Sequence, residues 1–408
     1  MLENTATQDF SIEHAICFEK QLQATQNDLY GGSANNWPGA GDKMQVKANV
    51  EVQTGREYFT DVSANGTQFT GAKRITAEMP SAASITTDGW VQGLERLLLA
   101  AMGYASVAGP VSIPSSPSFY RHFFVIPPQG RNQRKYTDDE SILAGDSYED
   151  DDDIKDTINT YLCISQKLGP YAQHVRNVVI KEAEISCSAK DSLQLTMSGP
   201  AERIDREDTK ESTKNWSISD GAFKDWFQLS DFQCFLGPAG TNAAACSITE
   251  FSAKISHGLS DDNTPTGTSN NGLSRAEPLP SGKSSVTLDL TVYLHDKTIY
   301  EDWAKNETIL TCKLEATRGQ YKFAILFPRL AITQVTPNFD GAGSIQFSLE
   351  ASWPNSEAEL EAIRNSFATE RGNVDWPLTS LMGVLVTSKE NRNPMRGMEV
   401  TETTNEEE

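Results

Sequence analysis

The stretch Ser285–Leu294 (SVTLDLTVYL) alternates apolar and polar residues without a break. A period of two is typical of a β-strand that buries one face and exposes the other to water. An earlier stretch, Met44–Val52 (MQVKANVEV), has the same alternation. Both stretches predict that the chain is built mainly of β-strands.

The predicted elements occur in the same order in two parts of the chain. Each part opens with an alternating strand, at 44–52 and at 251–255, and a second strand follows at 75–79 and at 286–294. A short helix that carries a tryptophan comes next, and a hairpin closes each part. Because a repeated order of elements indicates an internal duplication, we predict two tandem β-sandwich or barrel domains, each with a short flanking helix.

The helices and hairpins of the two parts differ in detail. The first helix is expected from Trp90 to Gly103 with Asp88 as its N-cap, and the second around Trp303. The hairpins are expected to turn at 190–191 and at 340–341. Alternating apolar residues flank both turns, so one face of each hairpin is expected to be buried.

The spacing between matched elements changes along the chain. Gly71 and Gly282 are 211 residues apart, whereas Leu193 and Ile345 are 152 apart, so the first part contains 59 extra residues. The predicted organisation is an N-terminal arm (1–40), a first domain (41–215) with an insertion at about 104–175, a second domain (216–354), and a C-terminal helix with an acidic tail (355–408).

The composition is strongly acidic. The chain of 408 residues has 56 Asp and Glu against 35 Lys and Arg, a net charge of −21. Such a surface does not wrap nucleic acid, because neutralising phosphates supplies most of that affinity, but it lets nucleic acid pass without sticking. Aromatic residues at 120–124 precede basic ones, a pattern that can bind nucleic acid. An acidic block follows the basic residues, which favours a packed strand at 120–124 over a nucleic-acid-binding site.

No local pattern of catalysis or metal binding is recognisable in the sequence, although a catalytic triad can assemble from residues far apart in the chain. The stretch Gly282–Ser284 resembles the end of a phosphate-binding loop, but Glu277 stands where the first glycine is required. The histidines never form pairs at i and i+4, and the six cysteines contain no C-x-x-C, so we expect buried, reduced thiols made in a cytosol. We therefore expect no enzyme activity, no cofactor, no metal, no signal peptide and no membrane span.

The order of elements resembles the tail tube (major tail) protein of long-tailed bacteriophages, in a duplicated form. The resemblance rests on 75–79, the helix 90–103, 285–294, the helix around Trp303, 323–327 with Pro328, Ile332, and 345–349. It implies a structural virion protein whose inner sheet joins its neighbours into a ring. Rings stack into a hollow tube through which the genome leaves.

The resemblance also implies partners and a location. A duplicated chain would form trimeric rings with pseudo-sixfold symmetry, located in the virion tail after synthesis in the host cytoplasm. The partners it implies are further copies of the chain, the tape measure protein, the tail terminator or baseplate proteins, and DNA in transit. Two other functions stay open, a carbohydrate-binding or carbohydrate-cleaving β-sandwich and another virion β-protein such as a decoration or baseplate component.

Two groups of residues are candidates for the functional surfaces. Polar residues that alternate with apolar ones could face the lumen or the outside of the tube, and the candidates are Glu51, Glu78, Asp289 and Glu350. The polar segment 259–281 is too long for a hairpin turn, and it is either a loop that stacks one ring on the next or a passive surface loop. Its candidate stacking residues are Asp261, Asp262, Asn263, Asn270 and Asn271. A capping box at Ser356 and Glu359 predicts the C-terminal helix.

Overall fold

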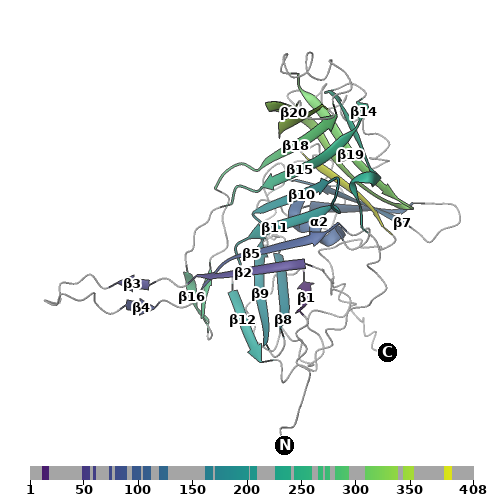
Figure 1. Ribbon diagram of the computed structural model, residues 1–408. Helices are drawn as coiled ribbons and strands as arrows, with labels where there is room; N and C mark the ends of the chain where they lie inside the picture. Colours follow the sequence, from purple (N-terminus) through teal and green to yellow (C-terminus); the bar gives the residue numbers. More distant parts are fainter. Residues whose placement is uncertain are drawn as a thin grey trace, which may run out of the picture.

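The computed structural model (Figure 1) shows a protein that is mainly β, as the sequence predicts. The structure describes residues 12–17, 48–55, 58–60, 73–75, 79–89, 94–102, 104–111, 119–126, 161–168, 171–201, 203–208, 226–239, 243–259, 265–269, 272–275, 281–293, 308–338, 343–352 and 381–387. Among these, no helix is long and apolar enough to span a membrane.

The largest sheet is antiparallel and contains 14 strands. Eight of them, which we call the front layer, follow the order β2-β5-β11-β10-β15-β18-β21-β20. Their bounds are β2 (Ala48–Gly55), β5 (Met79–Asp88), β11 (Gln194–Gly199), β10 (Glu182–Ser188), β15 (Ile248–Ser256), β18 (Ser285–Tyr293), β21 (Ser344–Ala351) and β20 (Tyr321–Asn338). Both predicted hairpins, β10 with β11 and β20 with β21, are confirmed.

Strand β20 belongs to two layers. Residues 330–338 pair with β21 of the front layer, whereas residues 321–330 pair with β19, and 322–326 pair with β22 on the other side. The second layer, which we call the back layer, follows the order β14-β13-β19-β20-β22-β7-β6. Its further strands are β14 (Ala244–Cys246), β13 (Phe232–Pro238), β19 (Leu310–Arg318), β22 (Met382–Thr387), β7 (Phe119–Val125) and β6 (Tyr104–Val111).

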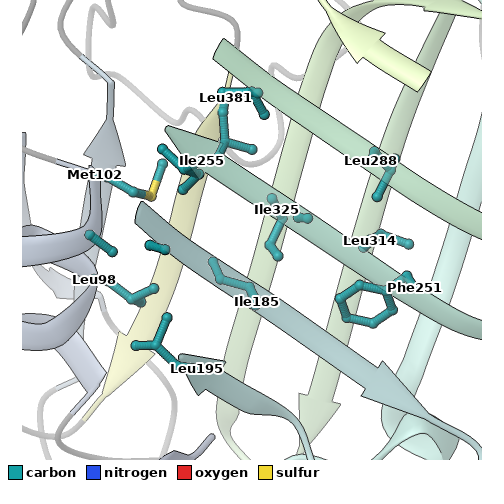
Figure 2. Close-up of a cluster of buried hydrophobic side chains, with 14 of the residues drawn as sticks. Leu98, Met102, Ile185, Leu195, Phe251, Ile255, Leu288, Leu314, Ile325 and Leu381 are labelled. Atoms are coloured by element: carbon teal, nitrogen blue, oxygen red, sulfur yellow. The ribbon is translucent and has the colours of Figure 1, made fainter. Parts of the chain in front are cut away.

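The hydrophobic core lies where the front and back layers face each other. Figure 2 shows the front strands crossing the back strands, with Ile185 and Phe251 pointing towards Ile325 and Leu314. Aromatic rings join the layers, since Phe232 of β13 lies 5.0 Å from Phe251 of β15 between ring centroids. Burying one face of each sheet against the other gives a β-sandwich.

A short helix, α2 (Leu94–Met102), completes the core. Leu94, Leu98 and Met102 are buried, and the carbonyl of Ala101 lies 2.6 Å from Nε2 of the buried His257. The helix expected near 90–103 is therefore confirmed. The N-cap at Asp88 is wrong, because Asp88 ends β5 and accepts a hydrogen bond from the Ser192 hydroxyl (2.7 Å).

Two small hairpins lie outside the layers, and each bears on a prediction. Strands β3 (Tyr58–Thr60) and β4 (Lys73–Ile75) pair with each other between β2 and β5. Of the predicted strand 75–79, Ile75 lies at the end of β4 and Met79 at the start of β5, and residues 76–78 lie outside the described residues. Strands β16 (Pro265–Ser269) and β17 (Gly272–Arg275) pair between β15 and β18, so the segment 259–281 is partly a hairpin and not only an irregular loop.

The predicted insertion at about 104–175 supplies strands to two sheets. Its first strands, β6 and β7, join the back layer, and the packed strand expected at 120–124 is confirmed in β7, where His122 and Phe124 are buried. The later part of the insertion contributes β8 (Tyr161–Leu168) and the first part of β9 (Tyr171–Val179) to a second, four-stranded sheet. This sheet also contains β1 (Ile12–Cys17) and β12 (Arg203–Asp208). Val175 and Val178 of β9 connect this sheet to the main core.

Several predictions fall outside the described residues. These are the helix around Trp303, the capping box at Ser356 and Glu359, and the turn at 340–341. The C-terminal segment, expected as a helix and an acidic tail, contributes strand β22, which the sequence analysis did not predict. The domain boundaries stay predictions. In the structure, the front layer runs without a break through both proposed domains.

Candidate lumen face and assembly edges

The front layer has one apolar and one polar face. In β18, Val286, Leu288 and Leu290 are buried in the core, while Thr287 and Asp289 point to the opposite side. The same alternation occurs in β10, β11, β15 and β21. The opposite side, which we call the polar face, therefore continues across several strands and across the junction between β10 and β15.

The polar face is acidic. Carboxylates outnumber amines among its described side chains, with Glu182, Glu184, Glu250, Asp289 and Glu350 against Lys254. A polar hollow in this face spans the β10·β15 junction, and its lining includes Glu184, Ser186, Ser252, Lys254, Asp289 and Gln346. Apart from Lys254, the charged and hydroxyl groups named here are carboxylates and serine hydroxyls, which repel phosphate or bind it weakly.

Hydroxyl groups hold several of these carboxylates in place. The Ser252 hydroxyl donates to Oε1 of Glu184 (2.6 Å), and the Ser348 hydroxyl donates to Oδ1 of Asp289 (2.7 Å). Each bond joins neighbouring strands and orders an acidic side chain on the surface. Lys254 Nζ lies 3.7 Å from Oδ2 of Asp289, a contact that offsets only part of the negative charge.

The predicted lumen residues have different positions in the structure. Asp289 and Glu350 share the polar face on the paired strands β18 and β21. Position 51 lies opposite Ser84 in the register of β2 and β5, and its side chain is outside the description, as is the whole of Glu78. Their role in a lumen stays a prediction. Sequence reasoning missed Glu184 and Glu250, although both alternate with apolar residues.

The proposed stacking residues Asp261, Asp262, Asn263, Asn270 and Asn271 all lie outside the described residues. The base of their segment is described. The carbonyl of Gly258 accepts hydrogen bonds from the N–H groups of Ser281 (2.8 Å) and Gly282 (2.9 Å). These bonds close the segment into a narrow neck, independently of the hairpin beyond it.

The thiols of the core are poorly suited to chemistry. Cys187, Cys234 and Cys312 are buried, and burial raises the pKa of Cys187 to about 12. Cys246 donates a hydrogen bond to the Cys234 sulfur (3.2 Å), and this bond together with burial raises the pKa of Cys246. Neutral thiols are weak nucleophiles and metal ligands. Within the described part of the chain, no cluster of side chains could hold a metal ion.

The front layer consists of two runs with the same strand order. The first run is β2-β5-β11-β10 and the second is β15-β18-β21-β20, joined where β10 pairs with β15. A small hairpin lies between the first two strands of each run. The registers also match, because Val50 lies opposite Ile85 as Ala253 lies opposite Leu288, and both residues are shifted by 203.

Comparison with known families gives the class of the protein. Residues 28–354 match the family model described as phage tail tube protein, which is well over half of the 408 residues. The chain therefore belongs to the phage tail tube protein family, a family of structural proteins, and this membership implies a location in the virion tail. A search of curated proteins gave no match.

Proposed function

We propose that the chain polymerises into rings of three copies that stack into the hollow tail tube through which DNA passes. The observation that carries this proposal is the repeated strand order of the front layer, which gives each chain two similar units. Three such chains present six units around one axis. Closed rings of identical chains are a common symmetry and leave no strand edge exposed.

The polar face is proposed to line the lumen. At eight front strands per chain, three chains would contribute 24 strands to a closed inner sheet. With strands about 4.8 Å apart, that sheet would have a backbone diameter of about 37 Å or more, wider than a DNA double helix. The carboxylates on this face would keep phosphates from sticking to the wall.

Family membership also supports partners at the ends of the tube. We propose that the rings contact the tape measure protein and the tail terminator or baseplate proteins, after synthesis in the host cytoplasm. Each contact would use ring surfaces formed by the ends of the strands, because the faces of the front layer are occupied by core and lumen.

Electron microscopy of the purified protein at high concentration tests the assembly. We expect rings or tubes, and a mass of three chains per ring. A mass of six chains per ring would contradict the duplication, and a protein that stays monomeric at all concentrations would contradict polymerisation.

Charge reversal tests the lumen. Replacing Asp289 and Glu350 by lysine, together with Glu51 and Glu78, is expected to slow or stop genome ejection while tubes still form. The control is Gln233→Lys, on an exposed position of the back layer. Normal ejection from particles with the four lysines would show that these residues do not line the path of DNA.

We further propose that segment 259–281 contacts the next ring. Replacing residues 260–280 by a two-residue turn is expected to leave a folded subunit, because the neck at Gly258 already brings β15 and β18 together. That subunit should form no stacked tubes, since ordering a segment costs about 1–2 kcal/mol per residue and needs contacts to offset it. Tubes of normal length and stability would show that the segment is passive surface.

A further inference from the structure

We infer that β2 of one chain pairs with residues 331–337 of β20 in a second copy, in the register of the internal β10·β15 junction. The inference rests on the proposed ring and names the two edges that would close it. Among the described strands, β2 pairs only with β5, and residues 331–337 pair only with β21. These two edges end the front layer on opposite sides.

The junction inside the chain serves as the template. There the last strand of the first run meets the first strand of the second run, antiparallel, over seven residue pairs. Glu184 lies opposite Lys254, Ile185 opposite Ala253, and Ser186 opposite Ser252. The junction keeps apolar residues opposite apolar residues on the core side and polar residues opposite polar residues on the other side.

Strand β2 occupies the place in the first run that β15 occupies in the second. Ala48 lies opposite Thr87 as Phe251 lies opposite Leu290, again shifted by 203 residues. Gly55 and Gly258, which follow at the ends of these strands, are also 203 apart. Positions 49–51 are therefore equivalent to 252–254.

The end of β20 occupies the place of β10. Val335 lies opposite Phe347 as Ile185 lies opposite Leu195, and in each run this hairpin is next to the second strand. Positions 334–336 are therefore equivalent to 184–186. Transferring the junction to two chains places Gln334 opposite Glu51, Val335 opposite Val50, and Thr336 opposite Asn49.

The residues on the two edges fit this pairing. Val335 is half-buried against the core, whereas Thr333, Gln334 and Thr336 are exposed. The transferred register sets valine opposite valine and polar residues opposite polar residues. Edge strands that stay unpaired are commonly blocked by charges, especially lysine. Residues 48–55 and 331–337 together contain no lysine, one carboxylate, Glu51, and one proline, Pro337, which lacks an N–H and lies just beyond the three transferred pairs.

The front layer of one chain is open, and Figure 1 shows β2 and β20 at its opposite ends. Seven strand spacings separate them along the front layer, which amounts to about 34 Å. Pairing in the transferred register therefore requires a second copy. Each chain then offers one edge of each kind, and a ring closes when the last copy meets the first.

Engineered cysteines test the register. The double variant Glu51→Cys with Gln334→Cys places thiols on directly opposed positions, where β-carbons lie within or close to the range that disulfides span. On mild oxidation of assembled protein, we expect covalent species up to three chains on a denaturing, non-reducing gel. Mixing the two single variants should give covalent dimers only, because each chain then carries one reactive edge.

The control shifts the register by two residues on the same face. In Glu51→Cys with Thr336→Cys the thiols are diagonal neighbours, with β-carbons about 7–8 Å apart, and cross-linking should fall at least tenfold. Asn49→Cys with Thr336→Cys is a second in-register pair, in case the first variant does not fold. Cross-linking of both in-register pairs supports the inference.

The outcomes separate the inference from the proposed function. Rings that form without in-register cross-links, or that cross-link better through the shifted pair, overturn this register while polymerisation stands. A ladder that extends beyond three chains overturns closure by three copies. Failure of the unmodified protein to form rings or tubes at any concentration overturns both.

Discussion

The two runs of the front layer share a strand order but differ in the side chains they bury. The register sets Ala83, Ile85 and Thr87 of β5 in the places of Val286, Leu288 and Leu290 of β18. Smaller residues therefore line part of the first run. The helix α2 contacts β7, β22 and β6, and its Leu98 belongs to the same buried cluster as Ile185 and Leu195, which Figure 2 labels.

The second run is covered differently. Aromatic residues of the back layer lie over it, as the contact of Phe232 with Phe251 shows. Phe347 of the second run is fully buried, and Leu195 has the equivalent place in the first. The two runs therefore keep the same strand order although they bury side chains of different size. Different elements pack against each run.

The largest expected effect comes from truncating the equivalent core residues Phe347 and Leu195. Phe347→Ala should lower the free energy of unfolding by about 4 kcal/mol and Leu195→Ala by about 3 kcal/mol, because the larger side chain leaves the larger cavity. Denaturant titration followed by tryptophan fluorescence measures both. As a control, Gln346→Ala at the exposed position next to Phe347 should change the free energy of unfolding by less than about 0.5 kcal/mol. If Leu195→Ala lost more free energy of unfolding than Phe347→Ala, the prediction that the larger side chain leaves the costlier cavity would be contradicted.

A second prediction concerns the neck after β15. Gly258 has φ +61°, and an added β-carbon would lie 2.7 Å from the carbonyl oxygen of Gly282. Gly258→Ala should therefore destabilise the protein by about 2 to 3 kcal/mol, from the left-handed backbone and the clash together. The matched control is Gly319→Ala, with φ +62° and nothing within 4 Å, which should cost about 1 to 2 kcal/mol.

Equal losses in thermal or denaturant unfolding for these two glycine variants would show that the neck relaxes at no cost.

A third prediction uses the buried Cys187 of β10, whose equivalent in the second run is Pro337. Burial raises the pKa of this thiol to about 12, above its value of about 8.5 in an unfolded chain. The stability from keeping it neutral is present below the unfolded pKa and is lost as the pH rises. Between pH 8 and 10 the wild type should lose about 1 to 2 kcal/mol more than Cys187→Ala.

Stability curves measured at both pH values check this difference. The same slope in the wild type and in Cys187→Ala would show that the thiol ionises as easily in the folded protein as in the unfolded chain.

The smallest expected effect concerns the ion pair of Lys254 with Asp289 on the polar face. Both side chains are partly exposed, at 54% and 33%, so Lys254→Met should change stability by less than about 1 kcal/mol. The first run has Glu51 at the equivalent position. A loss above 2 kcal/mol in denaturant titration would show that the second run depends on this pair in a way that the first run does not.

Regular alternation made some strands predictable. The hairpins around Ile185 and Phe347 and the strand at 285–293 follow from apolar residues at every second position. The alternation fails in β20, where residues 323–328 are buried without interruption because this stretch lies between β19 and β22 in the back layer. The sequence showed an apolar run there but gave no sign of the change between layers.

The structure differs from the expectation where local patterns compete. Ile75 and Met79 both fit an alternating strand, but Ile75 pairs with β3 and Met79 pairs with β2. Asp88 is a good helix N-cap, yet it stays in β5 because β5 pairs with β11 as far as this residue. Among the surface residues, alternation placed Asp289 and Glu350 on a polar face, and the same alternation held for Glu184, which the sequence analysis did not name.

The sequence by itself determined that this protein is mainly β and which residues of its alternating strands are buried, and it predicted a repeated order of elements, of which the two runs of the front layer share the strands. These properties follow from local side-chain chemistry, because a half-buried strand needs apolar residues at every second position. Only the tertiary structure decided that both runs share one sheet and which edges remain at its ends. Strand partners such as β5 and β11 are more than 100 residues apart, and any alternating strand can pair with many others, so their choice depends on the packing of the whole core.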